Sequence, residues 1–141
     1  MNTKPKVLVL CTGNSMRSQL AEGLLRHDLG EKIEVFSAGT HPCDVHPNTI
    51  EALAEIGVDT SSHRSKNVQE FVDHDFDLVI TVCDSAKRNC PALPGARAMV
   101  HKGYPDPFDL APGENLQVVF AHLRDRMREE LAEIVRQKLS L

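Results

Sequence analysis

A cysteine and an arginine stand six positions apart near the start of the chain, in the segment CTGNSMR of residues 11–17. An apolar run precedes this segment and a helix-spaced pattern follows it. Gly13 and Asn14 tolerate the unusual backbone angles of a tight turn. Successive backbone N–H groups in such a turn form a concave nest for a tetrahedral anion, and a helix N-terminus adds its dipole there. The segment is therefore predicted to bind an oxyanion.

Side chains of the same segment are suited to nucleophilic chemistry on that anion. Arg17 supplies planar, paired donors for two anion oxygens. Its positive charge is expected to lower the pKa of Cys11 below the free value of about 8.5. Ser18 is placed to donate a hydrogen bond to the resulting thiolate, so Cys11 is predicted to act as a nucleophile. The residues expected to bind the anion are Thr12, Gly13, Asn14, Ser15, Met16, Arg17 and Ser18.

Two further cysteines and an aspartate follow later predicted strands. Cys83 comes directly after an apolar run, and Cys90 lies seven positions further on, in a stretch of small and polar residues. This spacing fits a redox pair on a mobile segment, and it also fits two unrelated buried thiols. Asp106, in an Asp-Pro step, fits either a general acid or an ordinary turn.

The surrounding pattern indicates which elements position these residues. Apolar β-branched runs read as buried strands, and apolar residues at helical spacing read as amphipathic helices. Strands are expected at 7–10, 33–36, 78–82 and 97–101, and helices at 18–29, 48–56, 67–72 and 116–139. Their alternation predicts one α/β domain over residues 1–141, with a four-stranded parallel sheet and helices on both faces. In such folds ligands bind at the carboxyl ends of the strands, where these reactive residues fall.

Composition narrows the class of protein. The chain has 141 residues, 41% hydrophobic and 26% charged, with a net charge of -4, which disfavours nucleic-acid binding. Arg124, Arg126 and Arg128 alternate with acidic residues and predict a solvated helix face. No membrane-spanning run or secretory signal is expected, so the protein is predicted to be cytoplasmic, and a monomer is the simplest expectation. The four cysteines lack the close pairs of a zinc site, so neither a metal nor a cofactor is expected.

The motifs together resemble the low-molecular-weight protein tyrosine phosphatase superfamily, and in particular its thioredoxin-coupled arsenate reductase branch. The resemblance covers nearly the whole chain. It rests on segments 11–15, 17–19, 21–23, 37–39 and 106–107, and on the C-x6-C-P pattern that begins at Cys83.

This resemblance implies that Cys11 attacks arsenate, with phosphate and sulfate as competing oxyanions. Cys83 then attacks the sulfur of Cys11 and arsenite leaves, and Cys90 closes a disulfide with Cys83. Thioredoxin would reduce that disulfide, and Asp106 would act as the general acid.

Two other functions stay open. A low-molecular-weight phosphatase would hydrolyse phosphate monoesters through a Cys11 phosphoenzyme and would need neither Cys83 nor Cys90. That branch has tyrosines after its Asp-Pro step, whereas this chain has Phe108 and Asp109. A non-catalytic oxyanion-sensing module is the third interpretation.

Two further residues, Cys43 and Lys66, lie near the motifs. Cys43 lies in a proline-flanked loop and is interpreted as a bystander. Some relatives bind potassium through equivalents of Asn14, Glu22 and Ser37. Lys66 lies in the downstream region where a further oxygen donor would be expected, and its ammonium is predicted to supply the positive charge beside Glu22 instead.

Overall fold

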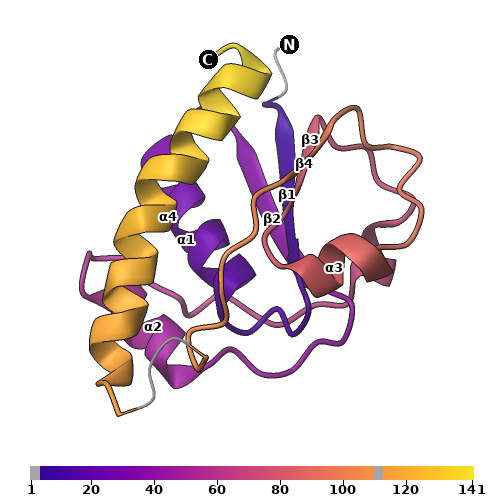
Figure 1. The fold of residues 1–141 in the computed structure, drawn as a ribbon. Coiled ribbons are helices and arrows are strands. Elements are labelled where there is room, and N and C mark those ends of the chain that lie inside the picture. Colours follow the sequence, from indigo (N-terminus) through magenta and orange to yellow (C-terminus); the bar gives the residue numbers. More distant parts are fainter. Residues whose placement is uncertain (1–3, 110–112) are drawn as a thin grey trace.

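A four-stranded parallel sheet forms the centre of the protein in the computed structural model, which describes residues 4–109 and 113–141 (Figure 1). The spatial order of the strands is β2-β1-β3-β4. The strands are β1 (Lys6–Cys11), β2 (Glu34–Gly39), β3 (Leu78–Thr81) and β4 (Met99–His101). All four predicted strands and the parallel sheet are thus confirmed, with small differences at the strand ends.

Strand β1 is central because its residues are apolar on both faces. Val7 to Leu10 are fully buried, as a strand covered on both sides requires. Leu8 pairs with Phe36 of β2 on one side and with Val79 of β3 on the other. The chain leaves β1 toward β2 and later returns to its other side as β3, so the strand order reverses at the carboxyl end of β1, where ligands bind in such sheets.

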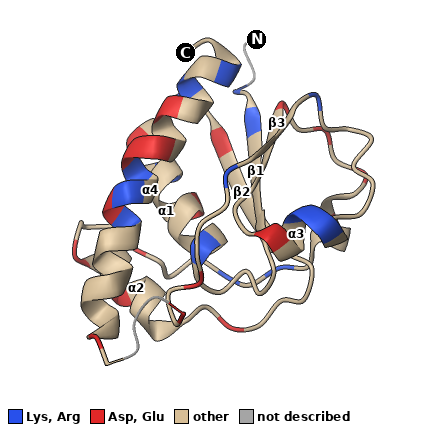
Figure 2. Ribbon diagram, viewed as in Figure 1, with Lys and Arg blue, Asp and Glu red and all other residues tan. Residues whose placement is uncertain are grey.

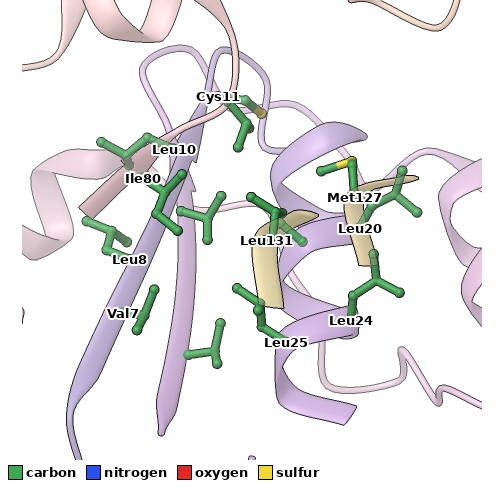
Figure 3. Packing of buried hydrophobic residues seen from close by; sticks show 14 of the residues in the cluster. Val7, Leu8, Leu10, Cys11, Leu20, Leu24, Leu25, Ile80, Met127 and Leu131 are labelled. Carbon is green, nitrogen blue, oxygen red and sulfur yellow. The ribbon is translucent and has the colours of Figure 1, made fainter. Parts of the chain in front are cut away.

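Helices cover the two faces of the sheet. They are α1 (Arg17–Leu29), α2 (Pro47–Ala54), the 3-10 helix η1 (Val68–Phe71), α3 (Asp84–Asn89) and α4 (Leu116–Leu139). Helices α1 and α4 lie on one side of the sheet, and α3 lies on the other (Figure 1). Leu20 and Leu24 of α1 are packed with Met127 and Leu131 of α4 in the core (Figure 3). The predicted helices are confirmed, whereas α3 was not predicted.

The arginines of α4 do not all lie on a solvated face. Lysines and arginines alternate with acidic residues along this helix (Figure 2). Arg124, however, is buried, and its Nη1 donates to the Ala52 carbonyl at 2.7 Å and lies 3.3 Å from Glu55 Oε1. The expectation of a solvated face is therefore wrong for Arg124, which ties α4 to α2.

Candidate active site

The segment between β1 and α1 is held in a curve by the loop at 40–46. Four backbone N–H groups of that loop donate to carbonyls of the segment, which point away from its concave side. They run from Thr40 to Cys11 (3.3 Å), His41 to Thr12 (2.9 Å), Cys43 to Gly13 (2.8 Å) and His46 to Ser15 (3.1 Å). The Ser65 hydroxyl donates to the Asn14 carbonyl at 2.7 Å. Because these carbonyls are already bonded to neighbouring segments, backbone N–H groups of the segment are expected to face an anion, apart from that of Asn14, which donates to Cys11 Sγ.

Asn14 fixes the sharpest point of this curve. Its backbone is left-handed, with φ of 47°, and its side chain is fully buried. The amide oxygen accepts N–H groups from Gln19 at 3.0 Å and from the Lys66 backbone at 2.9 Å. The amide nitrogen donates to the hydroxyls of Ser18 at 2.7 Å and Ser37 at 2.9 Å. These four bonds explain how a non-glycine residue keeps a positive φ here.

The same bonds set the direction of the hydrogen bond to Cys11. Since Ser18 Oγ accepts from Asn14, its own proton is free to donate to Cys11 Sγ, 2.8 Å away. The Asn14 backbone N–H also donates to this sulfur at 3.2 Å. The predicted contact between Ser18 and Cys11 is therefore present, and two donors face the sulfur.

Burial raises the pKa of Cys11 above its ordinary value, and the prediction of a lowered pKa is wrong. The residue is only 3% exposed and belongs to the apolar core, at the end of β1 (Figure 3). Desolvation of the thiolate is the largest influence on this pKa. Hydrogen bonds from Ser18 and Asn14 act in the lowering direction, and the neighbouring Cys83 adds a smaller raising effect.

The nitrogens of the Arg17 guanidinium differ in their hydrogen bonding. Its Nη1 donates to the carbonyl of Tyr104 at 2.8 Å. Its Nε, by contrast, is buried and has no hydrogen-bond partner among the described residues. A buried donor left unpaired is costly, so this atom is suited to an arriving acceptor. In a guanidinium the Nε–H and one Nη2–H form one edge, the paired geometry that binds two oxygens of an anion.

A cleft of about 530 Å³ is lined by three of the predicted site residues, whereas Cys11 is not part of its lining. Cys83 and Asp106 line it together with Arg17. Cys83 Sγ lies 3.3 Å from Thr12 Oγ1 of residues 11–17, the predicted anion-binding segment. Asp106 Oδ1 accepts the backbone N–H of Phe108 at 2.9 Å, in a turn that fixes the carboxyl group. Residues from the ends of β1, β3 and β4 thus meet in one place.

Cys90 lies at the other end of α3. Cys83 caps the start of this helix, where its sulfur accepts the Ala86 N–H at 3.4 Å, and Cys90 ends it. The segment between them is therefore helical in this structure, where the sequence suggested a mobile stretch. All four cysteines are free thiols. Cys43 is exposed, and a Cβ added to Gly13 would lie 3.0 Å from its sulfur, a contact that the sequence did not reveal.

A buried charged cluster supports the anion-binding segment from behind. Glu22 accepts the Ser37 hydroxyl at 2.7 Å, and it lies 2.9 Å from Arg26 and 3.4 Å from Lys66 Nζ. The predicted position of the Lys66 ammonium beside Glu22 is thus confirmed. Although burial alone would raise the pKa of Glu22, the Ser37 hydrogen bond and the neighbouring cations bring it below its usual value. Burial lowers the pKa of His63, whose Nε2 lies 3.6 Å from Glu22, so the ring is neutral near pH 7.

Two negative observations concern the described residues 4–109 and 113–141 only. In that part of the chain, no group of three or more histidine, cysteine or acidic side chains is arranged to hold a metal ion. No helix within the same ranges has the length and apolar character needed to cross a membrane.

A doubly wound α/β sheet with a thiol under an oxyanion-binding turn defines a class of cysteine-dependent enzymes that act on tetrahedral anions. The chain belongs to the low molecular weight phosphotyrosine protein phosphatase family, whose pattern matches residues 6–140.

Individual relatives narrow the comparison. An arsenate reductase of Halalkalibacterium halodurans is 38% identical over 129 residues, which are 91% of this chain and 93% of the relative. A solved arsenate reductase in a phosphate-binding state is 30% identical with a TM-score of 0.80, over 94% of this chain and 98% of the other. The thioredoxin-dependent arsenate reductase of Corynebacterium glutamicum is 32% identical with a TM-score of 0.69, over 99% of this chain and 65% of the other.

Proposed function

We propose that this protein reduces arsenate to arsenite through three of its cysteines. The observation that favours this over simple hydrolysis is the place of Cys83, whose sulfur borders both the cleft and the anion-binding segment. A phosphatase needs one thiol, because water completes its cycle. A reductase needs a second thiol within reach of the first, because the two electrons that arsenic accepts must come from sulfur.

The first step forms a bond between Cys11 Sγ and arsenic. The N–H groups of residues 12–18 and the Nε edge of Arg17 hold the arsenate oxygens. Asp106 protonates the departing hydroxide, which leaves as water. The proton that Cys11 loses replaces the one that Asp106 gives, so the net products are the sulfur–arsenic adduct and one water. Burial raises the pKa of Cys11 and so disfavours its thiolate. The Ser18 and Asn14 donors act against this effect and stabilise the thiolate as it attacks.

The second and third steps exchange disulfides. The Cys83 thiolate attacks Cys11 Sγ, the sulfur–arsenic bond breaks with its electron pair remaining on arsenic, and arsenite leaves. The Cys90 thiolate then attacks Cys83 Sγ and releases Cys11 as a thiol. The product is a Cys83–Cys90 disulfide, in which two thiols have been oxidised while arsenic(V) has been reduced to arsenic(III).

This last disulfide requires α3 to unwind. Cys83 and Cys90 flank the helix, and seven residues at the helical rise place their Cα atoms about 10 Å apart. A disulfide needs Cα atoms within roughly 7 Å of each other. Helix α3 is therefore expected in the dithiol state and lost in the disulfide state.

An external dithiol must restore the enzyme, and we infer that this dithiol is thioredoxin. The thioredoxin-dependent relative supports the inference. A reducing cytoplasm is the compartment that fits, because Cys83 and Cys90 must start each cycle as thiols. We expect the whole chain to act as one domain and as a monomer, and to need no cofactor of its own.

The test is arsenate-dependent oxidation of NADPH by the purified protein with thioredoxin and thioredoxin reductase. Turnover should stop in Cys83→Ser and in Cys90→Ser. Cys43→Ser is the matched control, because it removes an exposed thiol outside the relay and should leave turnover unchanged.

The other functions give different results in the same assay. Cleavage of an aryl phosphate by all variants alike, without arsenate-dependent oxidation, would identify a phosphatase. Binding of arsenate with neither activity would identify a sensing module.

A further inference from the structure

Tyr104 links Arg17 to helix α4, and no residue of α4 has a role in the mechanism proposed above. Its carbonyl accepts Arg17 Nη1 at 2.8 Å, and its own backbone N–H donates to the Val82 carbonyl at 2.8 Å. Its phenol donates to Glu130 Oε1 of α4 at 2.9 Å. The residue is 3% exposed. One buried residue therefore connects the end of β3, the site arginine and the C-terminal helix.

Charged groups gather around this phenol. Arg126 lies 5.1 Å and Lys102 lies 5.6 Å from the centre of the Tyr104 ring, within the range of cation–π attraction. Arg126 Nε also donates to Glu130 at 3.1 Å, and Lys102 Nζ lies 3.8 Å from the same carboxylate. Burial and the Glu130 charge raise the pKa of Tyr104, so the phenol keeps its proton and stays a donor near neutral pH.

We propose that Tyr104 and Glu130 are positioning residues that orient Arg17 for the oxyanion. With Nη1 held by the Tyr104 carbonyl, the guanidinium has one orientation left, in which the unpartnered Nε faces inward. If the Tyr104–Glu130 bond is lost, the carbonyl moves with the released ring and this orientation is populated less. The inference deepens the proposed function, since it assigns to Arg17 the anion contact on which that function rests.

The experiment measures phosphate binding, which does not depend on arsenate turnover. Bound phosphate should protect Cys11 from alkylation by iodoacetamide, and peptide mass spectrometry follows Cys11 separately from the other thiols. Tyr104→Phe and Glu130→Ala should each weaken phosphate binding about fivefold, the size of one ordinary hydrogen bond, because the loss reaches the anion only through Arg17. Glu130→Gln, whose amide oxygen still accepts from the phenol, should stay within about twofold of the wild type.

Two comparisons separate positioning from a general structural role. Glu129→Ala changes the exposed neighbour on α4 and should leave binding unchanged. In an Arg17→Lys background, Tyr104→Phe should add less than about twofold, because the group that Tyr104 orients is gone.

Three results would overturn the proposal. They are wild-type phosphate affinity in Tyr104→Phe and Glu130→Ala, an equal loss in Glu129→Ala, or the full fivefold loss persisting in the Arg17→Lys background. If Tyr104→Phe fails to fold, the Glu130→Ala and Glu130→Gln pair decides.

Normal phosphate binding by every Tyr104 and Glu130 variant in a protein that reduces arsenate would refute the positioning role alone. Absence of arsenate reduction in the wild type would refute the proposed function and leave the binding test intact.

Discussion

The anion-binding segment and helix α3 meet at one cleft but are held in opposite ways. In the segment and the helix that follows it, Asn14, Ser18 and Gln19 are fully buried and linked by hydrogen bonds. In α3, Ala86 is the buried residue, while Lys87 and Arg88 face solvent. A helix of six residues has little intrinsic stability and depends on such contacts.

The difference fits the roles proposed for the two regions. Binding of a tetrahedral anion benefits from donors that are already in place, because no reorganisation is then needed during the reaction. Closure of the Cys83–Cys90 disulfide needs the opposite, a segment that can leave its helical form. The protein therefore combines a rigid binding turn with a helix of low local stability.

The largest effect on activity should come from a substitution of Asn14, whose side chain holds the anion-binding segment together. Asn14→Asp keeps the acceptor oxygen but replaces the donor to Ser18 with a second carboxylate oxygen. Ser18 then donates to the introduced carboxylate instead of to Cys11, and the new negative charge opposes the thiolate. We expect kcat/KM for arsenate to fall about 10²- to 10³-fold, the range for loss of one oxyanion-stabilising donor.

Asn14→Gly separates the backbone from the side chain at this position. Glycine adopts the positive φ without strain, so any loss in Asn14→Gly reports the four side-chain hydrogen bonds alone. Full activity in this variant would show that the side-chain network is dispensable.

A smaller effect is expected from the support behind the turn. Lys66→Met removes a cation whose side chain is 10% exposed and leaves the buried Glu22 with less compensation. The free energy of unfolding should fall by about 3 kcal/mol in urea denaturation. The matched control is Arg26→Met, which removes a cation that is 45% exposed and should cost about 1 kcal/mol or less.

The pH dependence has a definite sign. Glu22 has a lowered pKa in the folded protein, so its charge stabilises the fold above pH 4.5 and this contribution is lost as the pH falls through the folded value. The difference between the wild type and Lys66→Met should therefore shrink on acidification below pH 4.5. A difference that stays constant down to full protonation would show that Lys66 does not act through Glu22.

The next effect concerns the donor to the nucleophile. Ser18→Ala removes a hydrogen bond that lowers the pKa of Cys11, so this pKa should rise further and kcat/KM near pH 7 should fall about tenfold. The pH profile of Cys11 alkylation should move to higher pH. Ser65→Ala, which removes a hydroxyl bonded to the Asn14 carbonyl and not to the sulfur, should leave that profile in place.

Local patterns in the sequence were sufficient to predict the sheet and the binding turn. The run at 7–10 is apolar without interruption, and Gly13 and Asn14 suit a turn whatever surrounds them. The contact between Ser18 and Cys11 also follows from short spacing. Helix α3 escaped prediction because its six residues contain one apolar side chain, Ala86, and show no helical periodicity.

The other failures involve distant parts of the chain. The pKa of Cys11 depends on how much protein covers its sulfur, which no spacing in the sequence reveals. The burial of Arg124 depends on its bond to Ala52, 72 residues away, which the local charge pattern does not reveal. The place of Tyr104 is hidden from the sequence for the same reason, since its contacts with Arg17 and Glu130 join three separate elements.

The smallest effect is expected in α3 and tests whether this helix is lost on oxidation. Lys87→Gly and Lys87→Ala both remove the same exposed charge from the middle of α3, but glycine costs the helix about 1 kcal/mol more than alanine. If α3 exists only in the dithiol state, glycine weakens that state alone. The reduction potential of the Cys83–Cys90 disulfide should then be about 20 mV more negative in Lys87→Gly than in Lys87→Ala. Phosphate binding should be equal in the two, because the rigid turn is unchanged. Equal potentials would mean that α3 survives oxidation, and that the disulfide closes by another movement of the chain.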